Sequence, residues 1–244
     1  MTVAFGSSVR VLATGFGPFP GIERNASEAI VRALGRFPEC APRVEVETAV
    51  IPVAWAEAQG VARRAIARFE PHAVLHFGVS KRAQGFEIET RAFNIGGPKE
   101  DAAGVVRPVT RLVRGAPRLL EASLPPRLLL RALRSGGYPA ELSNDAGRYL
   151  CNALFYWSLM DAQAHGRLVS FVHIPALGAG MQVQPRIAMD EAVAATRILV
   201  RASAEAVLRA KPSGAATRGG RNGNGSQGIH GNGRRGGAVR RFAG

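Results

Sequence analysis

Three consecutive segments with strand-like and helix-like patterns constrain the fold more than any other part of the chain. Val44–Ile51 alternates in polarity and ends at Pro52, which indicates a strand. Trp55–Phe69 has apolar residues at helical spacing, and after Pro71 comes Ala73–Gly78, a short apolar run typical of a buried strand. A strand, a helix and a strand in this order predict a parallel sheet with helices on both faces. We therefore predict an α/β fold, a three-layer α/β/α sandwich around a mostly parallel twisted sheet.

Other segments extend this pattern on both sides. They are strands at Val9–Ala13, Tyr138–Leu142 and Leu168–Ile174, a strand-like stretch with Phe86, Ile88 and Phe93, and helices at Asn25–Leu34, Pro126–Leu133, Tyr149–Ala164 and Ile187–Ala210. In the strand-like stretch, alternation places Glu87, Glu89 and Arg91 on one side. Residues 96–126 are interrupted by Pro and Gly and give no assignable element.

The end of the chain has a different composition. Residues 211–244 contain eleven glycines, seven Lys or Arg and no Asp or Glu, and so account for half of the net charge of +14. Such a segment buries too little apolar area to fold. We predict an α/β domain over residues 1–210 and a disordered, basic, Gly/Arg-rich tail over residues 211–244. Such tails bind RNA loosely, but we favour a solvated tail, so nucleic acid is expected as a partner at most weakly.

Several classes of protein are disfavoured by composition. No run of 18 apolar residues is present, so no membrane span is expected, and the first residues lack the pattern of a secretory signal. The two cysteines, Cys40 and Cys151, make no disulfide framework and suit a reducing cytoplasm, which is the location we predict. Neither has a Cys or His neighbour at metal-ligand spacing, so no metal is expected.

The segment Ser143–Asn152, with the sequence SNDAGRYLCN, is the motif that most suggests chemistry. Gly147 allows a backbone turn that a residue with a Cβ resists, and the turn delivers Cys151 to the first turn of the following helix. Free N–H groups and the helix dipole there favour the thiolate, the reactive form of cysteine. From these residues alone, a small buried hydrophobic side chain is the commoner explanation of such a cysteine.

His173 lies near the carboxyl end of the predicted strand Leu168–Ile174. Active sites of open α/β sheets gather at this edge, although a histidine in a strand is more commonly a core residue. The other histidines have weaker positions: before a strand, inside one, in a turn and in the tail (His72, His76, His165 and His230).

The SNDAGRYLCN stretch resembles the cysteine signature of the pyroglutamyl peptidase I (pyrrolidone-carboxylate peptidase) family. Three more segments match that family in order, namely TGFGPF at Thr14–Phe19, ETRAFN at Glu89–Asn94 and FVHIP at Phe171–Pro175. The resemblance covers residues 8–210, approximately. It implies a cofactor-free cysteine exopeptidase that hydrolyses the bond after an N-terminal pyroglutamyl residue, so peptides with such an end are the expected partners.

The resemblance also implies site residues. Cys151 is the nucleophile of the implied triad, His173 carries the proton, and Glu89 orients the imidazole. The implied substrate contacts are Phe16 and Phe19 as walls for the pyroglutamyl ring, Asn25 as a polar contact, and Val79 and Tyr149 beside them. Loops within residues 96–126 make subunit contacts in the family, which is compatible with a homo-oligomer.

The chain departs from the family pattern at four places. Val79 replaces a glutamine of the substrate pocket, Thr90 replaces a basic residue, Glu87 replaces a small hydroxyl residue, and the loop Ala176–Gly180 differs. These departures favour a first alternative, a homologue that keeps the triad with altered or lost pyroglutamyl specificity.

Two further alternatives are an RNA-associated protein that acts through its tail and a glutamine amidotransferase. Amidotransferases place their cysteine in a glycine-flanked elbow after a strand. Cys151 lies instead between Leu150 and Asn152, which argues against that class.

Overall fold

The computed structural model describes residues 8–19, 21, 23–36, 40–175 and 187–210. The predicted tail (residues 211–244) and the Ala176–Gly180 loop lie outside the described residues. The division into a domain and a tail therefore stays a prediction. Among the described helices, none is long and apolar enough to cross a membrane.

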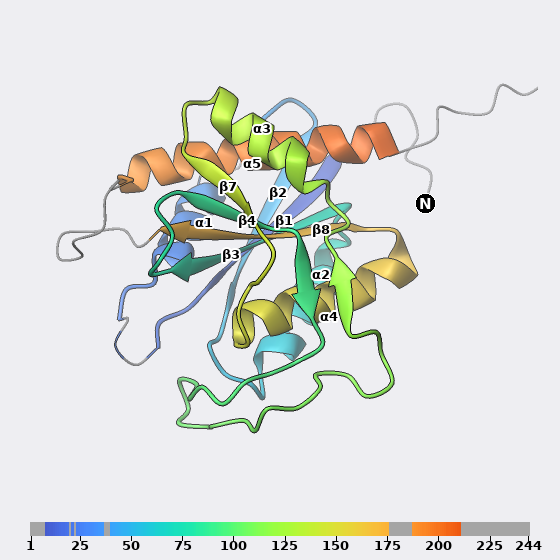
Figure 1. Ribbon diagram of the computed structural model, residues 1–244. Helices are drawn as coiled ribbons and strands as arrows, with labels where there is room; N and C mark the ends of the chain where they lie inside the picture. The colour runs from blue at the N-terminus through green and yellow to red at the C-terminus, as the bar shows by residue number, and fades with distance from the viewer. Residues whose placement is uncertain (1–7, 20, 22, 37–39, 176–186, 211–244) are drawn as a thin grey trace, which may run out of the picture. The chain divides into compact units, whose positions relative to one another are not determined.

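A six-stranded sheet forms the centre of the domain, in the order β2-β1-β3-β8-β4-β7 (Figure 1). Its strands are β1 (Val9–Phe16), β2 (Val44–Ile51), β3 (Ala73–Ser80), β4 (Phe86–Glu89), β7 (Ala140–Ser143) and β8 (Leu168–Pro175). Neighbouring strands are parallel except for β4 and β8, which are antiparallel. A separate antiparallel pair is made by β5 (Arg91–Phe93) and β6 (Leu119–Glu121).

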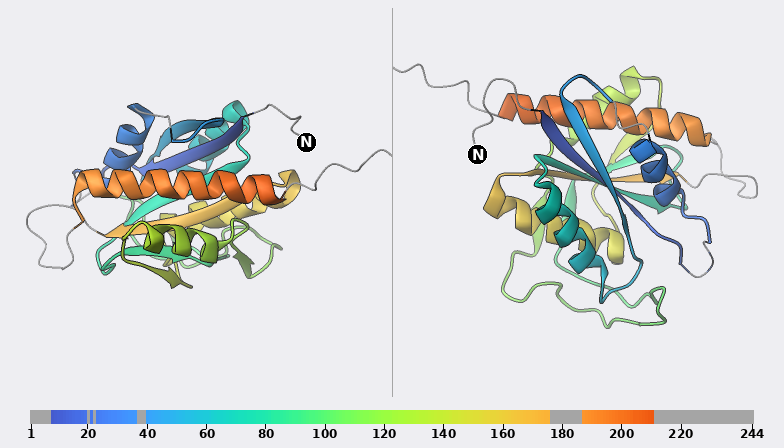
Figure 2. Two further views of the ribbon diagram at one scale, coloured as in Figure 1. Left: turned by 90° about the horizontal axis from the view of Figure 1, so that it is seen from above. Right: turned by 180° about the vertical axis from the view of Figure 1, so that it is seen from behind.

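Helices cover both faces of the sheet (Figures 1 and 2). One face packs against α1 (Ala26–Arg36), α3 (Pro126–Ser135) and α5 (Met189–Ala210), and the other against α2 (Ala58–Phe69) and α4 (Leu150–His165). The predicted three-layer α/β/α sandwich around a mostly parallel sheet is thus confirmed.

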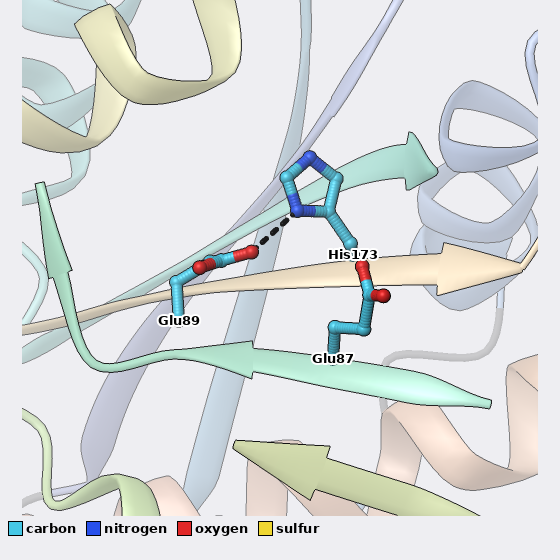
Figure 3. A group of neighbouring side chains, drawn as sticks. All are labelled: Glu87, Glu89 and His173. Carbon is cyan, nitrogen blue, oxygen red and sulfur yellow. Dashed lines mark hydrogen bonds and ion pairs between the residues drawn. The ribbon is translucent and has the colours of Figure 1, made fainter. Parts of the chain in front are cut away.

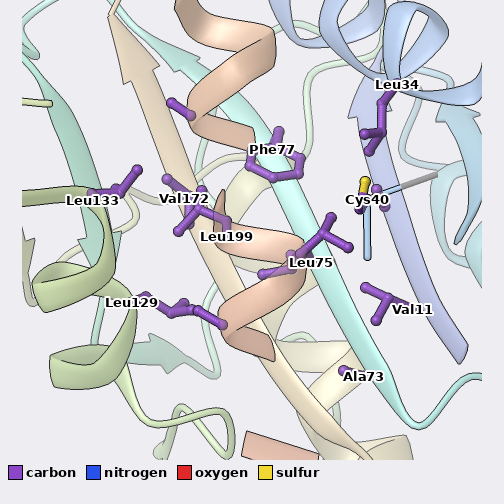
Figure 4. Packing of buried hydrophobic residues seen from close by; sticks show 14 of the residues in the cluster. Val11, Leu34, Cys40, Ala73, Leu75, Phe77, Leu129, Leu133, Val172 and Leu199 are labelled. Carbon is purple, nitrogen blue, oxygen red and sulfur yellow. The ribbon is translucent and has the colours of Figure 1, made fainter. Parts of the chain in front are cut away.

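Two apolar clusters fill the spaces between the layers. Val11 packs on the α5 side with Leu199, whereas its neighbour Leu12 packs on the α4 side with Leu154. Figure 4 shows the first cluster, in which side chains of β1, β3 and β8 meet those of α1, α3 and α5. Because successive strand residues point to opposite faces and both faces are covered, these strands read as continuous apolar runs in the sequence.

Two element boundaries differ from the prediction by three residues. Parallel pairing with β2 continues from Val9 to Phe16, so Thr14–Phe16 is strand rather than loop. The second helix begins at Ala58 rather than Trp55. Trp55 lies in the turn before it, where its backbone N–H donates to the Asp101 carboxylate (2.8 Å).

The predicted alternation of Glu87, Glu89 and Arg91 is wrong beyond Glu89. The chain leaves the main sheet at Thr90, and Arg91 begins β5 in the second sheet. The Arg91 guanidinium lies 3.8 Å from the carboxylate of Glu121, on β6. Arg91 is therefore paired across the small sheet and not with a glutamate of β4.

His76 is fully buried in the centre of β3 and bonded on both sides. Its Nδ1 lies 2.7 Å from the Thr14 hydroxyl, and its Nε2 lies 2.9 Å from the Ser158 hydroxyl. Burial lowers the pKa of His76 to about 3, because no charged neighbour compensates the lost hydration. This histidine is a neutral hydrogen-bonding bridge between β1, β3 and α4.

Candidate active site

The turn before α4 is built as the motif predicts. Gly147 has φ = +83°, a left-handed conformation that favours glycine. Asp145 Oδ1 accepts hydrogen bonds from the Gly147 backbone N–H (3.0 Å) and from Arg148 Nη1 (2.5 Å). Cys151 follows as the second residue of α4, where backbone N–H groups have no partner within the helix.

Gly78 on β3 makes room for the Cys151 thiol. A Cβ built on Gly78 would lie 3.1 Å from Cys151 Sγ and 2.9 Å from Phe171 Cζ, both tighter than ordinary contacts. The thiol is half-buried, and the strand passes directly beside it. A glycine within an apolar strand signals such a close approach, but the sequence does not tell which group approaches.

His173 and Glu89 form a buried pair beside the thiol. His173 Nδ1 lies 2.7 Å from Glu89 Oε1, and the two residues are 7% and 1% exposed (Figure 3). His173 comes from β8 and Glu89 from the adjacent β4. Among the described residues, the second carboxylate oxygen of Glu89 has no hydrogen-bond partner, so Oε1 provides the link that orients the imidazole.

The environment of His173 favours its charged form. Burial alone lowers the pKa of His173, but hydrogen bonds to the Cys151 sulfur and the Glu89 carboxylate, together with their negative charge, raise it to about 10. An imidazolium between a sulfur and a carboxylate is the arrangement that keeps a cysteine nucleophile ionised. The structure thus brings the three residues of the implied triad together from three separate segments.

A pocket of about 140 Å³ opens beside the thiol. Its walls include the five predicted substrate contacts, Phe16, Phe19, Asn25, Val79 and Tyr149, and also Val53, Lys99, Ala146, Leu150 and Cys151. A larger open groove of about 770 Å³ runs along Cys40–Val46. That groove contains no member of the Cys151, His173 and Glu89 group, so volume does not mark the reactive site.

Asn25 lies at the pocket, but most of its hydrogen-bonding capacity is used by the protein. Its Nδ2 donates to the Gly17 carbonyl (2.9 Å), and its Oδ1 accepts from the backbone N–H (3.1 Å) and hydroxyl (2.8 Å) of Ser27. These bonds fix the β1–α1 loop that carries Phe19. The second N–H of the amide is the group left for a ligand.

Lys99 is a pocket residue that the sequence did not indicate. Its ammonium lies 4.7 Å from the ring centroid of Tyr149 and 5.5 Å from that of Phe19. Tyr149 in turn donates its hydroxyl proton to the Glu100 carbonyl (2.8 Å). Burial and the nearby negative charges of Asp101, Cys151 and Glu100 raise the pKa of Tyr149 to about 12, so the phenol stays neutral.

Asn152, next to the thiol, ties the loop after β5 to α4. Its Oδ1 accepts from the Phe93 backbone N–H (2.7 Å), and its Nδ2 donates to the carbonyls of Phe93 (2.8 Å) and Ile95 (2.9 Å). Asn152 is fully buried. The Lys99 side of the pocket is thereby fixed to the helix that carries Cys151.

One group of neighbouring side chains in the described part of the chain offers metal-ligand atoms. The polar atoms of Glu87, Glu89 and His173 lie within 4.8 Å of one another. His173 Nδ1 is already bonded to Glu89, so we interpret the group as a pair of carboxylates around an imidazole.

A thiol, an imidazole and a carboxylate that converge beside a small pocket in an α/β sandwich are the groups of a cysteine hydrolase. The family model for pyroglutamyl peptidase matches residues 9–207. The chain belongs to the pyroglutamyl peptidase family, a family of cysteine peptidases.

Individual relatives agree with this assignment. The chain is 34% identical over 197 residues to pyrrolidone-carboxylate peptidase 1 of Ralstonia nicotianae, covering 78% of this chain and 90% of the relative. It is 29% identical over 211 residues to the pyrrolidone-carboxylate peptidase of Pyrococcus furiosus, covering 82% and 100%. The crystal structure of Bacillus amyloliquefaciens pyroglutamyl peptidase I matches with a TM-score of 0.76 at 25% identity, covering 81% of this chain and 98% of that one.

Proposed function

We propose that this protein is a cysteine exopeptidase that removes an N-terminal pyroglutamyl residue from peptides, with Cys151, His173 and Glu89 as its triad. The observation that carries the proposal is the position of the Cys151 thiol. It interacts with His173 of the buried His173–Glu89 pair and is also a wall of the 140 Å³ pocket. A small pocket with apolar walls that ends at a nucleophile suits a compact terminal residue better than an extended chain.

In the proposed reaction the Cys151 thiolate attacks the carbonyl carbon that joins pyroglutamate to the next residue. A C–S bond forms, and the backbone N–H groups at the start of α4 are candidate donors to the oxyanion. His173 then gives its proton to the leaving amine as the C–N bond breaks. Water, deprotonated by His173, hydrolyses the thioester and restores the thiolate, while Glu89 keeps the imidazole oriented.

The pocket supports recognition of the lactam ring. Phe16 and Phe19 supply apolar walls, and the free N–H of Asn25 and the ammonium of Lys99 are donors suited to the lactam carbonyl. Val79 supplies no side-chain amide where the family has one. This observation favours the second candidate, a triad-retaining hydrolase with altered specificity.

The state of the cysteines supports a reducing location. Cys40 and Cys151 are both free thiols, and the proposed nucleophile works only in its reduced form. We accordingly propose that the protein acts in the cytoplasm.

The test is hydrolysis of a chromogenic pyroglutamyl amide by the purified protein. Wild type and Cys40→Ala are expected to release the chromophore at similar rates, whereas Cys151→Ser is expected to lose activity by at least a thousandfold. Iodoacetamide is expected to inactivate both active forms. Activity retained in Cys151→Ser would refute the assignment of the nucleophile. An alkylatable Cys151 without pyroglutamyl hydrolysis, but with cleavage of another N-terminal amide, would establish the second candidate.

A further inference from the structure

His173 has two carboxylates beside it, and the proposed triad uses one of them. Glu87 and His173 are opposite residues of the antiparallel pair β4–β8, so their side chains project from the same face of the sheet. A Glu87 carboxylate oxygen lies within 4.8 Å of ligand atoms of both Glu89 and His173. Figure 3 shows both glutamates on the same side of β4, with Glu87 next to the point where His173 leaves β8 and Glu89 further along the strand, bonded to the imidazole.

The surroundings hold Glu87 in this place. From β3, Ser80 hydrogen-bonds the Glu87 side chain, and from β7, Glu141 is its partner in register. Burial raises the pKa of Glu87, the Ser80 bond and the charge of His173 lower it, and the charges of Glu89 and Glu141 raise it again. The carboxylate is half-buried and borders an open polar cleft, so it exchanges protons with solvent.

We propose that Glu87 is a positioning residue that sets the pH range over which Cys151 and His173 exist as a thiolate and an imidazolium. This inference rests on the proposed function of that pair. Glu89, not Glu87, is bonded to His173 Nδ1. Glu87 is also not among the residues that line the pocket beside Cys151. It acts through its charge on His173.

The sign of the effect follows from electrostatics. A negative charge beside the pair disfavours formation of the thiolate and favours retention of the imidazolium. Both proton losses therefore occur at higher pH when Glu87 is ionised. For unit charges about 5 Å apart at a partly hydrated site, the expected displacement is about half a pH unit to one pH unit.

The test compares Glu87→Gln with wild type by two pH profiles. The first is the rate of Cys151 alkylation by iodoacetamide in a Cys40→Ala background, which needs no substrate. The second is kcat/KM on a pyroglutamyl amide. Glu87→Gln is expected to move the alkylation midpoint, and both limbs of the kcat/KM profile, to lower pH by about half a unit to one unit. Glu87→Asp is expected to keep most of the wild-type profile.

Glu141→Gln is the matched control, because Glu141 is the register neighbour of Glu87 on β7, one strand further from β8 and His173. Its profiles are expected to move by a much smaller amount. Profiles of Glu87→Gln that coincide with wild type, or with those of Glu141→Gln, would overturn the inference. A shifted alkylation profile without any hydrolysis would support the role of Glu87 while refuting the proposed substrate. If Glu87→Gln does not fold, Glu87→Ser replaces it, since it also removes the charge; a shift in the same direction is expected, and an unshifted profile would count against the inference.

Discussion

Gly78 lies against the Cys151 thiol so closely that a single added methyl group would reach within 3.1 Å of Sγ. The same methyl would lie 2.9 Å from Phe171, whose ring packs 4.8 Å from His173, centroid to centroid. Gly78→Ala is therefore expected to displace the side chains of Cys151 and His173. We predict a fall in kcat of at least tenfold, measured on a pyroglutamyl amide.

The matched control for Gly78→Ala is Gly60→Ala in α2, where the nearest neighbour of the new methyl is the flexible end of Arg64. This change is expected to leave kcat unchanged and to raise the melting temperature slightly, because alanine favours a helix. Equal activities of Gly78→Ala and wild type would show that the thiol does not depend on this contact.

The Glu89–His173 bond predicts a change in pH dependence. The pKa of His173, lowered by burial but raised to about 10 by Cys151 and Glu89, keeps the imidazolium present at neutral pH and removes it as the pH rises through that value. Glu89→Gln removes a charge and retains the size of the side chain. We predict a loss of kcat of about 10²- to 10⁴-fold and an alkaline limb of kcat/KM moved to lower pH.

Glu121→Gln controls for the removal of a carboxylate elsewhere, since Glu121 pairs with Arg91 in the small sheet. Its pH profile is expected to match wild type. An unchanged alkaline limb in Glu89→Gln would contradict the role of Glu89 as the orienting acid.

Because Val79 has no side-chain amide, we predict weak recognition of the lactam. An unpaired polar group on a buried ligand costs about 1–3 kcal/mol, or roughly a factor of ten to a hundred in the specificity constant. Val79→Gln is expected to raise kcat/KM on a pyroglutamyl amide by up to that factor, mainly through a lower KM. Val79→Leu, which adds volume without an amide, is expected to lower it. A lower value for Val79→Gln would mean that Lys99, Asn25 or the backbone already satisfies the lactam.

Because Asn152 anchors the loop beside the pocket, its replacement is expected to lower the free energy of unfolding. Asn152→Ala leaves the Phe93 N–H and the Ile95 carbonyl, both partly buried, without the Asn152 amide, removes one of the two donors to the Phe93 carbonyl, and leaves a cavity. We expect a loss of about 2–4 kcal/mol in the free energy of unfolding, measured by urea denaturation. Asn144→Ala, an exposed position of the same motif, is expected to change it by less than about 0.5 kcal/mol. Similar values for both would contradict the anchoring role of Asn152.

The tail can be tested by deletion. Because residues 211–244 carry seven basic side chains and no apolar face, a chain ending at Ala210 is expected to keep its melting temperature and its kcat/KM. A large fall in melting temperature would show that the tail packs on the domain.

Local patterns marked Cys151 and His173 as candidates, and the family resemblance selected them. The turn through Gly147 is specified by the residues of the turn itself. His173 lies near the end of an apolar run, and in a parallel sheet the carboxyl ends of the strands form the edge where active sites gather. The resemblance added Glu89. The order of the main helices and strands could also be predicted, because each has a local periodicity in the sequence.

The remaining parts of the site depend on long-range pairing. Glu87 meets His173 only because β4 enters the sheet antiparallel to β8 in one particular register. Lys99 reaches the pocket because side chains hold its irregular loop in place, among them Asn152 on Phe93 and Ile95 and Asp101 on Trp55. No periodic pattern accompanies such side-chain to backbone bonds, so Lys99 could not be identified as a pocket residue from the sequence.

The buried imidazole of His76 makes the stability of the fold depend on pH. An unfolded chain binds a proton at this histidine below about pH 6.5, whereas the folded one, with a pKa of about 3, does not. Between these two values each further unit of acidity therefore favours the unfolded chain by up to about 1.4 kcal/mol from this residue alone. The bridge from Thr14 to Ser158 thus makes the fold sensitive to acid, and a vesicle of low internal pH is a poor environment for it.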